Sequence, residues 1–322
     1  MLKAMTNAKI GDDVFGEDPS INKLEKISAE MFGMESGLFC PSGTMTNQIA
    51  IKCHTQPGDE VICDESAHIY QYEGGGIAVN SSASVKLLYG DRGRINAMQV
   101  KAAINPDDNH KANTSIVCLE NTSNRGGGSC YDFMEIKKIK QVCVENDLSF
   151  HLDGARLWNA LVAKNESPAQ YGEVFDSVSV CLSKGLGCPV GSVLLGKKEF
   201  IQKARRVRKV LGGGMRQAGF VAAAGIYALQ NNIERLKQDH DNAKQIGEVI
   251  AKSSIAKFVL PIETNIIIFE TTDTATAPEI VEKLKQEDIL CNTVAADRVR
   301  FVVHLDITPE MVDKTIEIIK NI

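Results

Sequence analysis

The sequence predicts an α/β protein, with a large domain built on a mostly parallel sheet and a smaller α+β domain at the C-terminal end. From about Gly58 to Leu195, short apolar runs alternate with helical patterns. Strands separated by helices pair in parallel, and the helices cover both faces of the sheet. After about residue 231 the order of strands and helices changes. Since 322 residues are enough for two domains, we expect a large domain at 1–231 and a small one at 232–322.

Within the large domain, apolar runs of strand length alternate with longer amphipathic segments. The last predicted strand, Val178–Leu182, is followed soon by a further apolar run, Val193–Leu195. In such sheets, ligands bind at the carboxyl ends of the strands. The predicted strands are Glu60–Cys63, Ser84–Tyr89, Ser115–Leu119, Leu148–Leu152 and Val178–Leu182, and the predicted helices are Met98–Ile104 and Phe133–Asn146.

The C-terminal part begins with a long amphipathic helix from about Asn232 to Lys252, which we interpret as the bridge between the domains. Thr308 followed by Pro309 is typical of a helix start, with an N-cap and a proline at the first helical position. The expected order is strand Asn265–Glu270, helix Ala277–Gln286, strand Ile289–Thr293, strand Val299–His304 and helix Pro309–Asn321.

Composition is that of an ordinary globular protein, with 43% apolar and 24% charged residues. A net charge of -5 argues against nucleic-acid binding, and the basic run Lys203–Lys209 alone is more typical of a solvated helix face. No segment has the length of a membrane span or the pattern of a signal peptide. Nine scattered cysteines without a Cys-x-x-Cys pair favour reduced thiols in the cytoplasm and argue against a zinc site, so we expect no metal.

Lys184 is the first candidate for chemistry, because it follows an apolar strand and enters a glycine-rich loop. A lysine rarely lies at the end of an apolar strand unless its amine is paired or used as a nucleophile or Schiff-base former. Asp153 likewise ends the apolar run that begins at Leu148. Alone, such an aspartate is more often a helix cap. The two side chains at matching strand ends instead predict a pyridoxal 5′-phosphate (PLP) site, where the cofactor needs a lysine and an acid facing the pyridine nitrogen.

Two further segments contain the remaining groups that PLP requires. Gly43 and Thr44 follow Ser42 at the start of a predicted helix, where backbone N–H groups and the helix dipole favour a phosphate. Ser42 as a plain N-cap explains this segment equally well. His68 has an aromatic ring that can stack on a cofactor and an imidazole that titrates near neutral pH, although a lone histidine is more often structural.

Arg156 and Arg300 are candidates for binding a substrate carboxylate, because a guanidinium matches a carboxylate with two parallel hydrogen bonds. For Arg300, an exposed position on an edge strand is the alternative. No Gly-x-Gly-x-x-Gly or Walker motif supports a nucleotide site.

At this point the chain resembles the low-specificity L-threonine aldolase and L-allo-threonine aldolase family, PLP-dependent enzymes of the aspartate aminotransferase fold (fold type I). The resemblance extends over essentially the whole chain. The matching motifs are Gly11–Pro19, Pro41–Thr44, Ala67–Tyr70, Glu120–Thr122, Asp153–Arg156, Leu182–Gly187, Pro189–Ser192 and Gly212–Gln217.

The resemblance implies a seven-stranded, mostly parallel sheet and a role for each candidate residue. Lys184 would form the Schiff base with PLP, Asp153 would face the pyridine nitrogen, and His68 would stack on the ring and act as the base. The phosphate would lie at Gly43 and Thr44, and Lys209 would reach the phosphate of a neighbouring subunit. The resemblance therefore implies a homo-oligomer, at least a dimer and, as is usual in the family, a tetramer. Arg156 and Arg300 would hold the carboxylate of a small amino-acid substrate.

The implied reaction is retro-aldol cleavage of L-threonine or L-allo-threonine to glycine and acetaldehyde by an aldehyde-lyase. Two departures from the family bear on the substrate side. Family members begin with a segment of the type Leu-Arg-Ser-Asp-Thr-Val-Thr, whose serine helps to bind the substrate, and this chain starts after it, about fifteen residues later. Many members also have a histidine near the β-substituent where this chain has Ser123.

Two alternatives follow. One is other PLP chemistry on the same fold, namely β-elimination, aminotransfer or cleavage of phenylserine. The other is a PLP-binding subunit with little activity, because the N-terminal substrate-binding segment would be absent.

Overall fold

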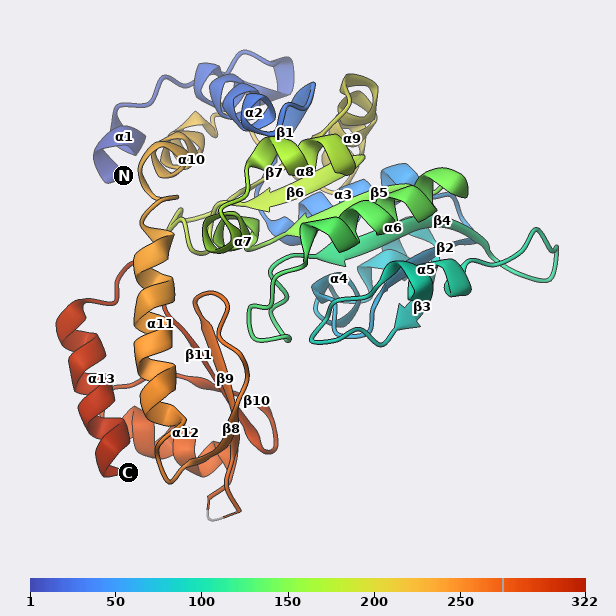
Figure 1. The fold of residues 1–322 in the computed structure, drawn as a ribbon. Helices are drawn as coiled ribbons and strands as arrows, with labels where there is room; N and C mark the ends of the chain where they lie inside the picture. The colour runs from blue at the N-terminus through green and yellow to red at the C-terminus, as the bar shows by residue number, and fades with distance from the viewer. Residues whose placement is uncertain (274) are drawn as a thin grey trace.

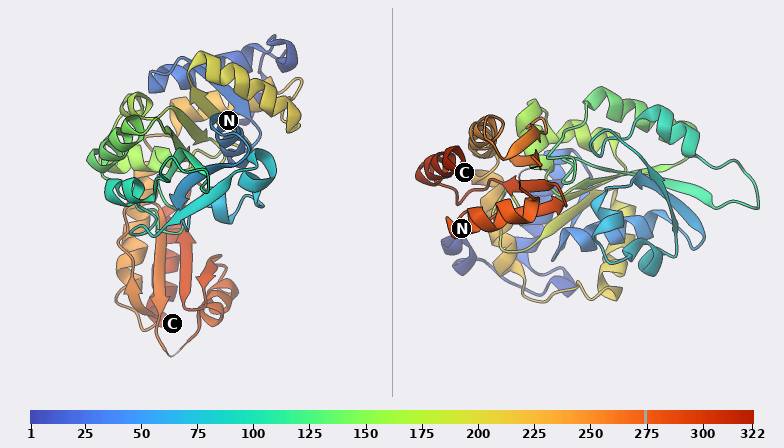
Figure 2. Two further views of the ribbon diagram at one scale, coloured as in Figure 1. Left: turned by 90° about the vertical axis from the view of Figure 1, so that its right-hand side faces the viewer. Right: turned by 90° about the horizontal axis from the view of Figure 1, so that it is seen from below.

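A computed structural model describes residues 1–273 and 275–322 of the chain. Two sheets organise it, a large one of seven strands and a small one of four (Figure 1). Both views in Figure 2 show the C-terminal unit, in orange and red, beside the large unit rather than inserted into it. The strands of the large sheet are β1 (Ser36–Cys40), β2 (Asp59–Asp64), β3 (Ser84–Leu88), β4 (Asn113–Glu120), β5 (Ser149–Gly154), β6 (Ser177–Cys181) and β7 (Ser192–Gly196).

The large sheet has the order β1-β7-β6-β5-β4-β2-β3 and is parallel from β3 to β6, while β7 is antiparallel to both of its neighbours. The predicted seven-stranded, mostly parallel sheet is therefore confirmed. β1 was not predicted, because its five residues include Gly37 and form no long apolar run. That glycine is needed for packing, since a Cβ there would lie 2.8 Å from the carbonyl oxygen of Glu25.

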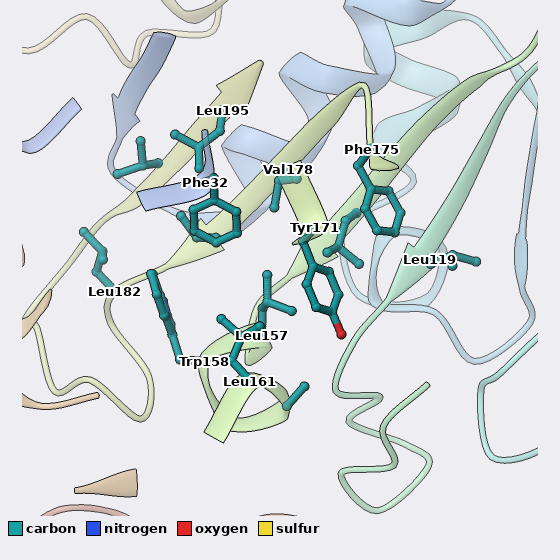
Figure 3. Close-up of a cluster of buried hydrophobic side chains, with 14 of the residues drawn as sticks. Phe32, Leu119, Leu157, Trp158, Leu161, Tyr171, Phe175, Val178, Leu182 and Leu195 are labelled. Carbon is teal, nitrogen blue, oxygen red and sulfur yellow. The ribbon is translucent and has the colours of Figure 1, made fainter. Parts of the chain in front are cut away.

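Helices cover both faces of the large sheet, which explains why every residue of the central strands β6 and β7 is buried. Figure 3 shows Phe32, Trp158 and Tyr171 packed over the strand residues Val178 and Leu195. One face is covered by α3 (Gly43–His54) and α9 (Lys198–Val210), and the other by α2 (Pro19–Phe32), α5 (Ala97–Ala103), α6 (Phe133–Glu145), α7 (Leu157–Lys164) and α8 (Pro168–Val174). Farther out, α10 (Gly219–Asn231) packs on α2, and α1 (Leu2–Thr6) packs on α10.

The small unit is an antiparallel sheet of order β10-β11-β9-β8 with three helices. The helix predicted from Asn232 begins only at Leu236, because Asn232 caps α10 and donates its side-chain amide to the Leu186 carbonyl (2.7 Å). The strand predicted at Ile289–Thr293 begins three residues late, as β10, and the short, half-exposed edge strand β8 was missed. The elements are α11 (Leu236–Ile250), β8 (Ala256–Val259), β9 (Ile266–Thr271), α12 (Ala277–Gln286), β10 (Asn292–Ala295), β11 (Arg298–Val302) and α13 (Pro309–Asn321).

The helix start at Thr308 is confirmed, since its side chain accepts from the Met311 N–H at 3.3 Å. We propose that the two sheets mark the two domains expected at 1–231 and 232–322, because α10 ends at Asn231. None of the described helices combines the length and the apolar character that crossing a membrane requires.

Candidate active site

The ends of three neighbouring strands bring the candidate residues together at one edge of the large sheet. β4 ends at Glu120, and this residue pairs directly with Asp153 on β5. β6 ends at Cys181, and Lys184 follows in a turn closed by a hydrogen bond from the Gly187 N–H to the Lys184 carbonyl (2.9 Å). The Lys184 side chain is half-buried, and its amine has no hydrogen bond or ion pair with any residue that the structure describes. Such an amine is available to a ligand.

Asp153 is buried, and both of its carboxylate oxygens accept hydrogen bonds. The Ala155 N–H donates to Oδ1 at 3.0 Å, and the side chain of Asn47 on α3 donates to Oδ2 at 2.9 Å. These two bonds fix the carboxylate between the end of β5 and helix α3, which packs on one face of the sheet.

Asn47 connects Asp153 to two more buried side chains. The second hydrogen of its amide goes to Glu73 (3.0 Å), and its oxygen accepts from Nε2 of His151 at 3.2 Å. Burial lowers the pKa of His151 to about 3, so its ring is neutral and its Nδ1 accepts from the Ser177 hydroxyl at 2.8 Å. The amide of Asn47 therefore has one consistent orientation, with both hydrogens on carboxylates.

His68 begins the short helix α4 (His68–Gln71), and Nδ1 of its ring hydrogen-bonds the Glu73 carboxylate at 3.0 Å. Glu73 is held from its other side by Gln48 at 2.6 Å. The hydrogen bond to Glu73 raises the pKa of His68, against the effect of its partial burial. With Nδ1 donating, Nε2 has the lone pair in the neutral ring, so Nε2 is the nitrogen that can accept a proton.

His68, Glu73 and Asp153 place one ligand-type atom each within 4.8 Å of one another. The amide of Asn47 donates to both carboxylates, and His68 donates to Glu73. Hydrogen bonds thus account for this group of acids without a metal ion.

Gly43 and Thr44 form the first turn of α3, where the N-cap Ser42 accepts from the Met45 N–H at 3.2 Å. The backbone N–H groups of such a first turn have no partner within the helix. A Cβ added at Gly43 would meet nothing within 4 Å, so the space in front of this turn is open. The geometry suits an anion, and binding of a phosphate there stays a prediction.

The two predicted arginines come from the large and the small unit and lie near one another. Arg156 comes three residues after Asp153, at the start of α7, and Arg300 lies on β11 of the small sheet. Nη1 of Arg300 donates to the side chain of Asn124 (2.8 Å), so the small sheet contacts the loop that follows β4. Burial lowers the pKa of Arg156, and the nearby charge of Arg300 lowers it further.

Ser123 and Lys209 differ from the other candidates. The Ser123 hydroxyl is buried and accepts from the Gly126 N–H at 3.2 Å, within its own loop. Lys209 is exposed at the end of α9, beside a surface cavity of about 790 Å³. Its neighbour Arg208 is buried and pairs with Asp13 at 2.7 Å, so the basic run is only in part a solvated face. Roles for Ser123 in substrate binding and for Lys209 at a neighbouring subunit stay predictions.

The chain is similar to known enzymes over almost its whole length. The family described as β-eliminating lyase matches residues 1–274. The chain is 40% identical to low specificity L-threonine aldolase of Escherichia coli strain K12, over 96% of this chain and 91% of that protein. It is 39% identical to low-specificity L-threonine aldolase 1 of Arabidopsis thaliana, over 98% of this chain and 90% of that one. The chain belongs to the low-specificity L-threonine aldolase family.

Solved structures of threonine aldolases have the same fold. A putative L-allo-threonine aldolase from Listeria monocytogenes superposes with a TM-score of 0.83 at 23% identity, covering 100% of this chain and 93% of that one. Threonine aldolase of Leishmania major gives a TM-score of 0.84 at 20% identity, over 98% and 92% of the two chains. The fold predicted from the resemblance to threonine aldolases is therefore confirmed, and so is the family.

Sequence reasoning assigned no role to Asn47, Glu73 or His151, although they form the hydrogen-bond network around Asp153. A signal for His151 was present, because residues two apart on a strand point to the same face, and His151 and Asp153 are two apart. Asn47 and Glu73 had no such signal, since Asn47 meets Asp153 only because α3 packs on the sheet, and Glu73, after α4, is joined to Asp153 through Asn47.

Proposed function

We propose that this threonine aldolase family member is a PLP-dependent aldehyde-lyase that cleaves L-threonine and L-allo-threonine to glycine and acetaldehyde. The observation that supports this most is the placement of Asp153 and Lys184 at neighbouring strand ends in a chain about 40% identical to low-specificity threonine aldolases. The substrate class follows from the names of those relatives, and the reaction from the groups described below.

The residues of the site fit PLP. Lys184 has an amine without a partner among the described residues, Asp153 has a fixed carboxylate to face the pyridine nitrogen, and His68 has a ring at the rim. The open first turn at Gly43 and Thr44 suits the phosphate. When bound, PLP supplies an electron sink that stabilises negative charge at Cα of the amino acid.

Arg156 and Arg300 would then hold the substrate carboxylate, which orients the Cα–Cβ bond for cleavage. Nε2 of His68 would take the proton of the β-hydroxyl, since Glu73 keeps the other ring nitrogen protonated. The network of Asn47, Glu73 and His151 would hold Asp153 and His68 in place, so that neither has to reorganise during the reaction.

We also propose a homotetramer of the cytoplasm in which Lys209 reaches the phosphate site of a neighbouring subunit. Its exposed position beside a surface cavity lined by Arg205, Arg206 and Gly214 is compatible with such a contact. All nine cysteines are free, and eight of them are buried, as reduced thiols would be.

β-Elimination is the second candidate reaction, because the matching family is described as β-eliminating lyase. The two reactions differ in their products. Retro-aldol cleavage of threonine gives acetaldehyde and glycine, while β-elimination of threonine or serine gives an oxo acid.

The test is to purify the protein with PLP, record its absorbance spectrum and assay both products with threonine, allo-threonine and phenylserine. We expect a visible band from bound PLP that disappears in Lys184→Ala, and aldehyde with glycine as products. An oxo acid as the main product would establish β-elimination instead. A visible band without turnover would identify a PLP-binding subunit with little activity.

A further inference from the structure

A third arginine lies at the substrate side of the site, and the proposed reaction on threonine gives it no role. Arg125 is half-buried in the loop after β4, one residue beyond Asn124, which hydrogen-bonds Arg300. Its guanidinium lies 5.7 Å from the centre of the Tyr72 ring, and that ring lies 5.7 Å from the ring of His68. Arg125, Tyr72 and His68 therefore form a row that leads to the proposed base.

Arg125, Arg156 and Arg300 have no carboxylate within ion-pair distance among the residues that the structure describes. Elsewhere in the described chain only Arg206, on the exposed side of α9, shares this property, whereas seven arginines pair with acids. The buried Nε of Arg300 has no hydrogen-bond partner in the described part of the chain, and burial followed by the charge of Arg125 lowers the pKa of Arg300. Arg300 lies close enough to Arg125 and to Arg156 for these charges to repel, and Glu120 offsets only the charge of Arg156 in part, so an anionic ligand would relieve the repulsion.

One substrate carboxylate does not occupy three guanidinium groups. It accepts the paired N–H bonds of one arginine and an additional bond from a second. Among the described residues Arg125 donates only through Nη2, to the Val294 carbonyl at 2.8 Å, so its other N–H groups are available to a ligand. The His68 ring lies beside Tyr72 and Tyr72 lies beside Arg125, so a β-substituent that extends from His68 past Tyr72 would reach Arg125.

From this arrangement we infer that the site accepts β-hydroxy-α-amino acids with a carboxylate on the β-carbon, of which 3-hydroxyaspartate is the smallest, and that Arg125 binds this second carboxylate. The inference rests on the proposed aldol cleavage for its chemistry. The Cα–Cβ bond breaks, its electron pair stays on Cα and takes up a proton, and the hydroxyl loses its proton to become the aldehyde oxygen. The products are glycine and glyoxylate, with no oxidant or reductant required.

Binding of two ligands that differ only in charge tests the inference without relying on cleavage. L-Aspartate and L-asparagine have the same shape, and neither has a β-hydroxyl group. In calorimetric titrations of the PLP-loaded protein, we expect aspartate to bind at least about tenfold more tightly than asparagine, as a charge-assisted hydrogen bond implies. Arg125→Gln should bring this ratio close to one, while Arg125→Lys should retain part of the preference.

Arg298→Gln is the matched control, because it removes an exposed positive charge from the same strand as Arg300. It should leave the aspartate preference unchanged. Equal affinities for aspartate and asparagine in the unaltered protein would overturn the inference. So would an equal loss of both affinities in Arg125→Gln, because Arg125 would then only tether the loop to Val294.

A second measurement separates this inference from the proposed function. The kcat/KM for L-threo-3-hydroxyaspartate relative to L-threonine should fall about tenfold or more in Arg125→Gln, with threonine cleavage itself retained. Absence of threonine cleavage would contradict the proposed function, while the aspartate to asparagine ratio would still decide the role of Arg125.

Discussion

The two sides of the site differ in how their polar groups are satisfied. On the cofactor side, Asp153, Asn47 and Glu73 are buried and hydrogen-bonded to one another, and each accepts or donates at short distance. On the substrate side, Arg125 and Arg300 are only partly engaged and have no ion pair among the described residues.

The difference implies that one side of the site is rigid before ligands bind and that the other is not. A satisfied buried network is rigid, because every rearrangement would leave a polar group without a partner. Charges without partners cost stability and remain available to a ligand of opposite charge. The cofactor side is therefore preorganised within the protein, whereas the substrate side is completed only when an anionic ligand binds.

The largest expected effect comes from removing the amine of Lys184 from the cofactor side. Lys184→Ala should lower kcat for threonine cleavage by about 10⁴-fold or more, as loss of a covalent nucleophile does. The measurement is steady-state aldehyde release at saturating PLP, with Lys101→Ala on the exposed face of α5 as the control lysine. Substantial turnover in Lys184→Ala would show that the cofactor side has been assigned wrongly.

The next effect is expected on the substrate side. Arg156→Gln and Arg300→Gln should each lower kcat/KM for threonine by about 10²-fold, because a charge-assisted hydrogen bond to the carboxylate is lost. The loss should appear largely in KM, since the cofactor side is unchanged. Arg298→Gln should retain the original kinetics, and an unchanged KM in both site variants would remove the two arginines from carboxylate binding.

The sequence predicts those residues of the two sides whose positions follow from a local pattern in the chain. Asp153 and Lys184 were predictable because each follows an apolar strand directly, and parallel strands place such positions at one edge. The short edge strand β8 and the five-residue β1 were not, because neither contains a continuous apolar run that distinguishes it from a loop.

The network around Asp153 required the structure for a different reason. Asn47 and Glu73 are 106 and 80 positions away from Asp153 in the sequence; Asn47 reaches Asp153 from α3, and Glu73 is linked to it through the Asn47 amide. Their side chains are common surface types, so no local pattern marks them as buried. Arg125 is similar, because its lack of an acidic partner becomes visible only when all neighbours are placed.

The cofactor and substrate sides should also differ in how much each contributes to the stability of the fold. Asn47→Ala should lower the free energy of unfolding by about 1–3 kcal/mol, because it leaves Asp153, Glu73 and His151 each short of one hydrogen-bond partner. Arg300→Gln should change it by no more than about 0.5 kcal/mol, since that arginine lacks an internal counter-ion.

Thermal unfolding of the PLP-free protein measures both variants, and Asn231→Ala, with an exposed asparagine at the end of α10, is the control. If Arg300→Gln were as destabilising as Asn47→Ala, the substrate side would be as well satisfied as the cofactor side, and the contrast between them would fail.

The smallest effect concerns pH. Glu73 raises the pKa of His68 above its ordinary 6.5, and the charges of Asp153 and Glu120 act in the same direction. If neutral His68 is the base, the rate rises with pH through this raised pKa. Glu73→Gln removes the main cause of the shift, so the rising limb should move to lower pH while the maximal rate changes little.

Two features make this pH measurement specific to the His68–Glu73 pair. Burial raises the pKa of Glu120 to about 6, so a second group titrates nearby, but Glu73→Gln does not alter its hydrogen bonds to the N–H groups of His68 and Asn124. The His68–Glu73 pair also contributes to stability. Because the pKa of His68 is raised in the folded state, this contribution is complete below pH 6.5 and is lost as the pH rises through the folded-state pKa. In Glu73→Gln that decline in stability should be weaker. A rate profile and a stability profile that both keep their midpoints would show that Glu73 holds Asn47 and leaves the basicity of His68 unaffected.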